Sequence, residues 1–374
     1  MYIGICIIAY NRINSLKRVL KSIEKAYYGE DSIELVISID KSSTNIVEEY
    51  AKQYKWRFGN KRIITHPHNL GLRNHVLKCG NLLDEFDAII VLEDDVYVAQ
   101  NYYLYSKECI NKFKDNENIA GISLYNFPIN YHNLQPFKAL HCDSDIYLMQ
   151  NAQSWGQIWM KQQWKEFIEW YHRNNEEFSS LPHLPNSICT WPKSSWLKYH
   201  TRYCIENNKY FVYPYISLST CFGDTGTHTA NYSTHIQSSL LYGLKRKYNL
   251  NTIMKYDAFF ENETIYKYLS IDKENLCIDF YGEKKNKLNK RFYLTRKILP
   301  YKIIKSYALA LKPYEMNIIN ELDGQELFLY DTTIPRKKQS NTSIEKLFNF
   351  YMYGIDISLL AIIKRHIKKM VNRK

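Results

Sequence analysis

The amino-acid sequence predicts an α/β fold in which helices flank a Rossmann-like, mainly parallel central sheet. Short continuous apolar runs alternate with segments of helical periodicity along the N-terminal third of the chain, which is typical of buried parallel strands joined by helices. Polar or acidic side chains follow the end of each apolar run. The chain has 374 residues and is 45% hydrophobic, which is enough to form the core of such a fold.

Four strands and three helices are expected in this region. Each expected strand is a short apolar run, and each expected helix has apolar side chains three or four residues apart, as in Leu16, Val19, Leu20 and Ile23. The expected elements, in order, are a strand at Ile3–Ala9, a helix that begins at Ser15, a strand at Ile33–Asp40, a helix from about Thr44, a strand at Lys61–Thr65, a helix at Leu72–Leu83 and a strand at Ala88–Leu92.

Polar segments follow all four expected strands. In open parallel sheets ligands bind beyond the carboxyl ends of the strands, so we expect these segments to line one crevice. Turns are polar in most proteins, and each segment taken alone also fits an ordinary turn. No GxGxxG follows the first strand and no GxxxxGK[ST] occurs, which disfavours dinucleotide and P-loop sites. The segments are Tyr10-Asn11-Arg12, Asp40, residues 66–69 and Glu93-Asp94-Asp95.

Three successive carboxylates end the fourth strand. Crowded like charges are costly unless a cation or hydrogen bonds compensate them. Mg²⁺ or Mn²⁺ is the simplest compensation, because such an ion takes one or two protein carboxylates and fills its other positions with water and substrate phosphates. A solvated acidic turn is the alternative interpretation of Glu93-Asp94-Asp95.

The positive charge of the chain is concentrated near its C-terminus. Residues 1–283 carry 30 Lys and Arg against 31 Asp and Glu, although the whole chain has a formal net charge of +12. The near-neutral body and the lack of an RRM, KH or helix-turn-helix signature disfavour nucleic acid as a partner.

Residues 336–374 form a basic segment that we call the tail. From Ser343 onward its apolar residues recur at helical spacing beside Lys364, Arg365, Lys368 and Lys369, which predicts a basic amphipathic helix or pair of helices. Such a segment can bind an anionic membrane surface, or it can pack on the body with its basic face in solvent. Without an export signal or a membrane-spanning run, we expect a cytoplasmic protein that associates peripherally with the inner face of the cell membrane.

The ordered motifs of residues 1–230 resemble those of inverting GT-A glycosyltransferases. The similarity is to bacterial family 2-like enzymes and, in motif order, to the N-acetylglucosaminyltransferase I group. The motifs are Ala9-Tyr10-Asn11-Arg12, Ser38-Ile39-Asp40, Asn69-Leu70-Gly71-Leu72-Arg73, Leu92-Glu93-Asp94-Asp95, Ser123-Leu124-Tyr125-Asn126, Ser154-Trp155-Gly156, Trp191-Pro192-Lys193 and residues 214–229.

The resemblance implies roles for four residues at the donor. Tyr10 and Asn11 would line the nucleotide pocket, Asp40 would contact the uracil or ribose, and Arg73 would approach the diphosphate. The donor would be a nucleotide sugar, in the first instance a UDP-sugar.

The resemblance also implies a metal centre for Mn²⁺ or Mg²⁺. Asp95 would be the direct ligand, while Glu93 and Asp94 would orient the ribose and sugar of the donor. His228 would meet the metal or diphosphate from the far side, and an ordinary polar loop histidine is the alternative.

Tryptophans are frequent between residues 155 and 196, and we expect Trp155 to contact substrate because aromatic faces suit sugar rings. An inverting transfer needs a base for the acceptor hydroxyl. An acid commonly follows the tryptophan of this region in the family, but here Trp196 precedes Leu197-Lys198-Tyr199. We therefore nominate Asp224, for which a structural loop aspartate is the alternative.

Together these observations predict a glycosyltransferase for hexosyl or N-acetylhexosaminyl transfer. The acceptor would be a glycan or a lipid-linked molecule in surface polysaccharide or glycoconjugate synthesis. A non-catalytic nucleotide-sugar or glycan-binding protein of the same fold is the alternative. The expected organisation is a nucleotide-sugar-binding half at 1–123, an acceptor-binding half at 124–250, an accessory region at 251–335 and the tail at 336–374.

Overall fold

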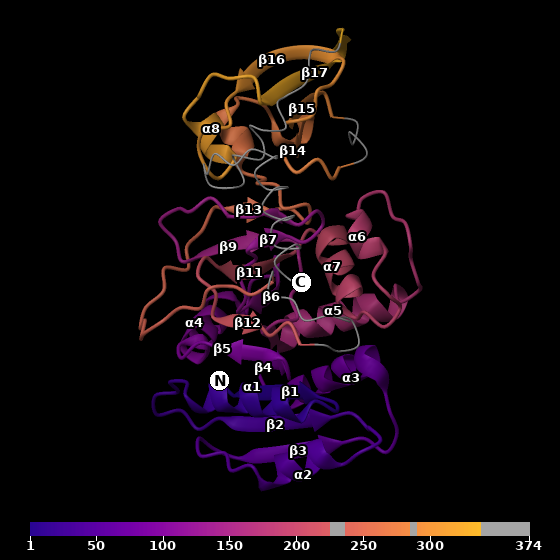
Figure 1. Cartoon of the computed structure of the whole chain (residues 1–374), viewed down its shortest axis with the longest axis vertical. Helices are drawn as coiled ribbons and strands as arrows, with labels where there is room; N and C mark the ends of the chain where they lie inside the picture. Colours follow the sequence, from indigo (N-terminus) through magenta and orange to yellow (C-terminus); the bar gives the residue numbers. More distant parts are fainter. Residues whose placement is uncertain (225–235, 285–289, 338–374) are drawn as a thin grey trace, which may run out of the picture. The chain divides into compact units, whose positions relative to one another are not determined.

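The computed structural model describes residues 1–224, 236–284 and 290–337. The chain forms two compact units (Figure 1). The first unit contains residues 1–129 and 141–258, and the second contains residues 130–140 and the described residues from 259 onward. The His228 and tail predictions fall on residues 225–235 and 338–374 and therefore lie outside the described residues, apart from Arg336 and Lys337.

The first unit is built on a nine-stranded sheet with the order β13-β9-β11-β6-β10-β4-β1-β2-β3. Strands β1 to β4 are parallel, as the sequence predicts. The predicted helix at 72–83 is α3 followed by the 3₁₀ turn η1. The elements of this half are β1 (Ile3–Ala9), α1 (Ile13–Glu24), β2 (Glu34–Ile39), α2 (Ile46–Gln53), β3 (Lys61–Thr65), α3 (Gly71–Cys79), η1 (Gly80–Asp84) and β4 (Ala88–Glu93).

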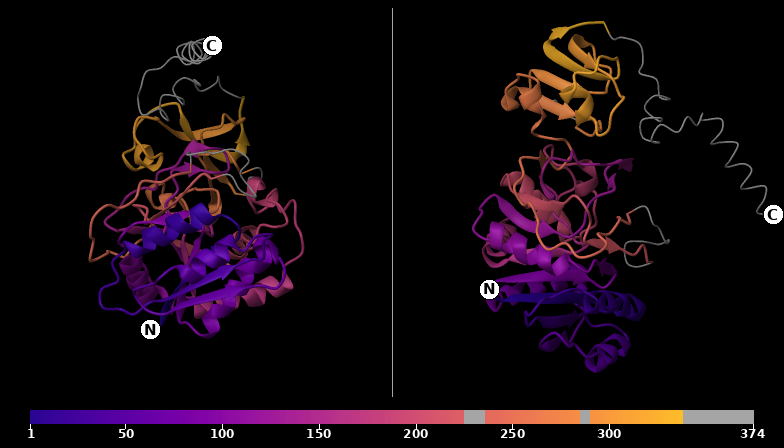
Figure 2. Two further views of the ribbon diagram at one scale, coloured as in Figure 1. Left: turned by 60° about the horizontal axis from the view of Figure 1, so that its bottom comes forward. Right: turned by 90° about the vertical axis from the view of Figure 1, so that its left-hand side faces the viewer.

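Both faces of β1 are buried, which explains its unbroken apolar sequence. Ile5 and Ile7 share one core with the apolar stripe of α1, from Leu16 to Ile23. Cys6 points to the other face, where its thiol lies against that of Cys79 in α3. The sheet is thus covered by helices on both faces, and Figure 2 shows these layers from two further sides.

The other half of the sheet is mixed rather than parallel. Strand β10 lies antiparallel between β4 and β6, and β9 lies antiparallel beside β11. A separate antiparallel pair joins β5 to β12. The elements of this half are β5 (Val96–Val98), α4 (Tyr102–Phe113), β6 (Ile119–Ser123), β9 (Ile146–Met149), β10 (Gln157–Met160), α5 (Lys161–Arg173), α6 (Asn186–Cys189), α7 (Leu197–Glu206), β11 (Tyr210–Pro214), β12 (Ser219–Cys221) and β13 (Lys255–Tyr256). This mainly parallel α/β architecture confirms the predicted fold class and is consistent with a GT-A fold.

The second unit contains a four-stranded sheet with the order β14-β15-β17-β16. Several basic side chains of residues 284–305 pair with acids of the same unit: Lys297 with Asp279 (2.9 Å), Arg291 with Asp331 (2.8 Å) and Lys305 with Glu321 (2.7 Å). The elements are β14 (Leu276–Asp279), β15 (Phe292–Thr295), β16 (Tyr301–Tyr307), β17 (Leu327–Pro335), α8 (Glu315–Ile319), the 3₁₀ turns η2 (Ile265–Tyr268) and η3 (Lys273–Asn275), and a short pair, β7 (Ile129–Asn130) with β8 (Gln135–Pro136).

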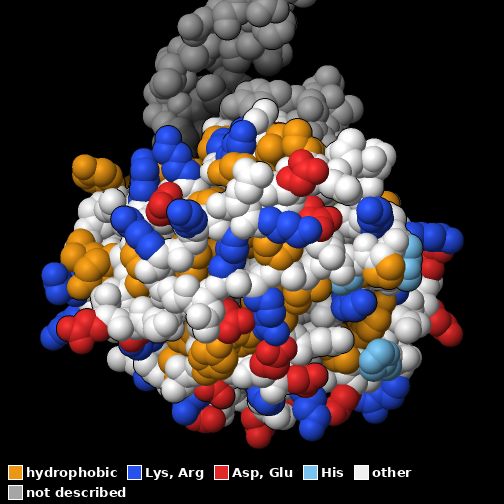
Figure 3. All heavy atoms as spheres, turned by 90° about the horizontal axis from the view of Figure 1, so that it is seen from below, with side chains coloured by type: hydrophobic (Ala, Val, Ile, Leu, Met, Phe, Trp, Pro, Cys, Tyr) orange, Lys and Arg blue, Asp and Glu red, His pale blue; other side chains and the backbone are white. Residues whose placement is uncertain are grey.

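The molecular face near β3 and α2 carries basic and acidic side chains scattered together, as Figure 3 shows. This mixture agrees with the near-neutral charge of residues 1–283. Among the described helices, none has the length and apolar content needed to cross a membrane.

His200 of α7 is fully buried in an aromatic cluster. Its ring stacks on Phe167 at 4.1 Å and meets the edges of Trp164 and Phe211. Neither ring nitrogen has a hydrogen-bond partner in the described part of the chain. Burial lowers the pKa of His200 from 6.5 to about 3, so the folded protein keeps this ring neutral over a wide pH range.

We expect His200→Phe to make the free energy of unfolding less sensitive to acid. Between pH 6.5 and 3 the unfolded chain binds a proton at His200 that the folded chain excludes, so stability falls as the pH falls below 6.5. Between pH 7 and 5 the wild type should lose about 2 kcal/mol more than the variant. Urea unfolding of both proteins at the two pH values measures the difference, and equal losses would contradict the burial of a neutral ring.

Candidate functional site

The main pocket of the first unit lies at the carboxyl ends of β1 and β4. The strand order 3-2-1-4 changes direction between these two neighbours, which is where ligands bind in open α/β sheets. The cavity measures about 1070 Å³, at the upper end of ordinary small-molecule sites. Of the residues predicted for the site, the lining contains Tyr10, Asn11, Asp40, Glu93, Asp94, Asp95, Trp155 and Asp224.

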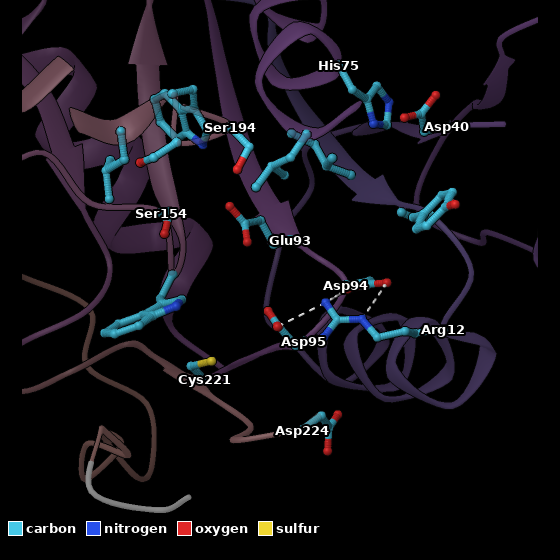
Figure 4. Close-up of a pocket in the computed structure, with 18 of the residues that line it drawn as sticks. Arg12, Asp40, His75, Glu93, Asp94, Asp95, Ser154, Ser194, Cys221 and Asp224 are labelled. Carbon is cyan, nitrogen blue, oxygen red and sulfur yellow. Dashed lines mark hydrogen bonds and ion pairs between the residues drawn. The ribbon is translucent and has the colours of Figure 1, made fainter. Parts of the chain in front are cut away.

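Arg12 connects the ends of the two central strands (Figure 4). Its guanidinium pairs with the buried Asp94 and donates a 2.9 Å hydrogen bond to Oδ2 of Asp95. The sequence analysis included Arg12 in a motif but gave it no role. Its position after β1, opposite an acidic strand end, was the available signal.

Burial raises the pKa of Glu93 and of Asp94, the two acidic residues before Asp95. It raises the pKa of Glu93 to about 8, with further contributions from the negative charges of Asp95 and Asp94. Burial also raises the pKa of Asp94 to about 6, although Arg12 opposes this shift. In Figure 4 the Glu93 carboxyl lies between Ser194 and Asp95, inside the pocket. The pocket thus holds more buried acid than Arg12 neutralises.

Asp95 differs from its neighbours because one of its buried carboxylate oxygens accepts no hydrogen bond from any described residue. Oδ2 accepts a hydrogen bond from Arg12, whereas Oδ1 is buried and accepts none from any described residue. A buried carboxylate oxygen without a donor is costly unless a ligand or ion reaches it. In the described ranges no three His, Cys, Asp or Glu side chains are grouped tightly enough to enclose a metal ion by themselves.

The pairing of β5 with β12 brings Asp224 to the site from far along the chain. The Phe222 amide donates to the Asp95 carbonyl at 2.8 Å and continues this pairing. The Asp224 carboxylate then pairs with Arg18 and accepts a 3.1 Å hydrogen bond from Ser15 Oγ. Both partners belong to α1, so Asp224 is held at the rim by two side chains of that helix.

Asp40 is buried, and its carboxylate accepts hydrogen bonds from main-chain amides at the start of α3. Its Oδ1 accepts hydrogen bonds from the amides of Lys41 and Leu70, both at 2.8 Å, and its Oδ2 accepts one from Gly71 at 3.0 Å. Gly71 has a φ of +74°, a conformation that favours glycine. A carboxylate at a helix N-terminus also interacts favourably with the helix dipole. Asp40 therefore has a clear structural role at the pocket wall.

Arg73 is directed to the segment at 174–196 and does not line the pocket. Its guanidinium donates to Tyr171 Oη at 2.7 Å and to the carbonyls of Asn175 and Lys193, at 3.2 and 3.4 Å. It also lies 4.2 Å from the ring centre of Tyr199. The structure thus brings Arg73 against the segment that forms the opposite wall.

Lys198 lies in the region after Trp196 where the sequence resemblance led us to expect an acid. The side chain is buried, and Nζ donates to the carbonyls of Phe178 and Trp191, both at 3.1 Å, while lying 4.3 Å from the Phe178 ring. Burial lowers its pKa. Lys198 and Arg73 therefore both hold the segment at 174–196 through hydrogen bonds to its main-chain carbonyls.

Trp155 lines the pocket, as expected, and packs edge-on against Tyr125 at 4.9 Å between ring centres. Trp159 and Trp164 stack in the core at 3.8 Å. The pocket lining also includes residues that the sequence motifs contained but to which no role was given, Ser154, Trp191 and Pro192, and residues that were not predicted for the site, Ser194, Ser195, Trp196 and Leu197.

Comparison with solved structures finds several glycosyltransferases. S. aureus TarS 1-349 in complex with UDP-GlcNAc is 12% identical, with 61% of this chain and 60% of that chain covered and a TM-score of 0.39. GalNAc-T7 with UDP, GalNAc and Mn²⁺ is 13% identical over 57% of this chain and 42% of that chain, with a TM-score of 0.41. The mannosyltransferase PcManGT from Pyrobaculum calidifontis, in complex with GDP-Man and Mn²⁺, is 12% identical over 45% of each chain, with a TM-score of 0.31. The chain thus spans less than two thirds of these proteins, and such distant likenesses assign no substrate.

A comparison with curated protein sequences gives no match. The family model described as Glycosyl transferase family 2 matches residues 4–187, which include β1 to β4, the acidic triplet and Trp155. Residues 4–187 of this chain are therefore similar to glycosyl transferase family 2.

Proposed function

We propose that this protein transfers a sugar from a nucleotide diphosphate donor, in the first instance a UDP-sugar, to a glycan or lipid-linked acceptor by an inverting displacement. The similarity to glycosyl transferase family 2 supports the reaction class. The observation that carries the proposal is the position of Asp95, at the switch point of the sheet with one buried oxygen left without a hydrogen-bond donor among the described residues.

A divalent cation fits this arrangement. Asp95 Oδ1 would hold Mn²⁺ or Mg²⁺, and donor phosphates and water would supply the remaining ligands, as is usual for these ions. When bound, the ion supplies charge stabilisation for the departing diphosphate. Arg12 keeps Asp94 and Oδ2 of Asp95 in place, so the free oxygen has a fixed direction. From the sequence alone, we also propose that His228 contacts the metal or the diphosphate from the side opposite Asp95.

The other donor roles remain proposals of the same kind. Tyr10 and Asn11 would line the nucleotide, Glu93 and Asp94 would orient the ribose and sugar, and Trp155 would contact the sugar ring. Arg73 would reach the diphosphate only by leaving Tyr171.

Asp224 is our candidate for the base that removes the acceptor proton. Its carboxylate lines the pocket, which supports the assignment, but the carboxylate is already engaged by Arg18 and Ser15. The ion pair with Arg18, together with Lys198 in the region where the sequence resemblance led us to expect an acid, favours the second candidate, a protein that binds a nucleotide sugar without transfer. Release of UDP from a bound donor distinguishes the two.

We also propose, from the sequence, that the tail binds an anionic membrane surface and that residues 1–123 and 124–250 serve donor and acceptor respectively. The described residues end at 337, so support for the tail comes from its composition and periodicity.

Replacing Asp95 tests the metal proposal. Asp95→Asn removes a charge and little volume, so we expect a folded protein that loses transfer and Mn²⁺-dependent donor binding. Calorimetric titration of UDP with and without Mn²⁺, together with UDP release from a panel of UDP-sugars, measures both effects. Asp115→Asn, which changes an exposed aspartate outside the pocket, is the matched control and should behave as the wild type. Full activity of Asp95→Asn would remove the metal assignment.

Replacing Asp40 tests whether this residue contacts the nucleotide as well as the start of α3. Asp40→Ala should lower the free energy of unfolding by about 1 kcal/mol, because the helix start loses its acceptor. If Asp40 also holds the base or ribose, the variant should raise the KM for the donor more than it lowers kcat.

The control for this experiment is Asn74→Ala. Asn74 donates to the Leu70 carbonyl at 3.0 Å, so it supports the same turn, but it does not line the pocket. We expect Asn74→Ala to leave the KM for the donor unchanged. An equal KM in Asp40→Ala and the wild type would show that Asp40 only supports the helix.

A further inference from the structure

A loop of the first unit, residues 242–247, exposes apolar side chains that the site does not use. Tyr242 is 99% exposed and Leu244 is 47% exposed, with Gly243 between them at a φ of +85°. None of these residues lines the pocket. Exposing two large apolar side chains so close together in the sequence is unfavourable in water. Such a pair therefore indicates a surface that contacts a binding partner or a membrane.

The exposure is built into the fold, because the residues on both sides of the 242–247 loop are anchored. Leu241 and Tyr248 pack against the core of the first unit, and the Leu241 amide donates to the Ser217 carbonyl at 2.8 Å. The Gly243 carbonyl accepts a 2.8 Å hydrogen bond from the buried Asn101, which precedes α4. These contacts hold the loop with Tyr242 and Leu244 outward.

The same loop carries three basic side chains. Lys245 pairs with Asp145, but Arg246 and Lys247 are exposed and form no ion pair with any described residue. The Arg246 guanidinium lies 5.9 Å from the ring centre of Tyr27, which is itself 40% exposed.

The nearby acids are already engaged. Glu108 accepts a hydrogen bond from the Tyr248 amide at 3.1 Å, and Asp145 accepts one from the Asn249 amide at 2.8 Å in addition to its pair with Lys245. Residues 242–247 themselves include three basic side chains and no acidic one, so the charge of the loop itself is positive.

We propose that the 242–247 loop binds the first unit to an anionic membrane surface. Tyr242 and Leu244 enter the boundary between headgroups and acyl chains, and Arg246 and Lys247 face the lipid phosphates. Tyrosine suits this boundary because its ring is apolar and its hydroxyl is polar, and basic side chains next to apolar ones add attraction to anionic lipid. This inference uses neither the tail nor the transfer reaction, so it can fail or hold independently of both.

The test uses the full chain and cosedimentation with phosphatidylcholine vesicles that contain or lack phosphatidylglycerol. The first variant, Tyr242→Ser with Leu244→Ser, should bind the anionic vesicles about tenfold more weakly than the wild type. The second, Arg246→Gln with Lys247→Gln, should lose about tenfold in binding to anionic vesicles and depend less on salt. The control, Ile46→Ser with Lys55→Gln, changes an exposed apolar and a basic side chain elsewhere in the unit and should bind as the wild type.

All variants change exposed side chains, so their melting temperatures should match the wild type and confirm that binding differences are local. Two results would overturn the proposal. In the first, both loop variants bind anionic vesicles as tightly as the wild type. The loop would then not contribute, and the tail would account for the vesicle binding. In the second, the wild type ignores the vesicles but forms a dimer that the Tyr242 and Leu244 changes dissociate, which would make the loop a contact between copies of the chain.

Discussion

The ion pair of Arg12 with Asp94 and Asp95 is the interaction on which the pocket depends. Three acidic side chains end a buried strand, and their repulsion has to be compensated before any ligand arrives. Arg12 provides part of this compensation, to Asp94 and Asp95, because β1 and β4 are direct neighbours in the sheet. The same pair fixes the carboxylates that we assign to the donor and metal. Strand order, through this contact, therefore determines the electrostatics of the site.

The remaining walls reach the pocket through contacts between segments far apart in the sequence. Pairing of β5 with β12 places Asp224 beside α1, and the two cations Arg73 and Lys198 hold the segment at 174–196. A cation that donates to main-chain carbonyls tolerates changes in the side chains of the segment it holds. This wall can therefore vary in sequence while keeping its position.

The sequence predicts the first half of the sheet well because its signals are local. Apolar runs and helical spacing located β1 to β4 and α1 to α3 within a few residues, and the residues at and after the ends of those strands include Tyr10, Asn11, Asp40 and the acidic triplet of the pocket lining. The antiparallel strand β10 could not be predicted in this way, because its direction depends on pairing with β4 and β6. The role of Arg73 against Tyr171 likewise depends on a contact across 98 residues. In the second unit β14 and β15 have only four residues each, and the longer β16 and β17 show no regular alternation of buried and exposed side chains that would reveal a strand.

The position of Asp40 affects how the evolution of such chains can be interpreted. Its carboxylate accepts main-chain hydrogen bonds at the start of α3 whether or not a nucleotide is bound. A related chain without transferase activity would still gain stability from this aspartate, because it supports the start of α3. Retention of Asp40 is therefore a poor marker of an active enzyme. Asp95 is a better marker, since only its Oδ2 pairs with Arg12, while its Oδ1 accepts no hydrogen bond from any described residue.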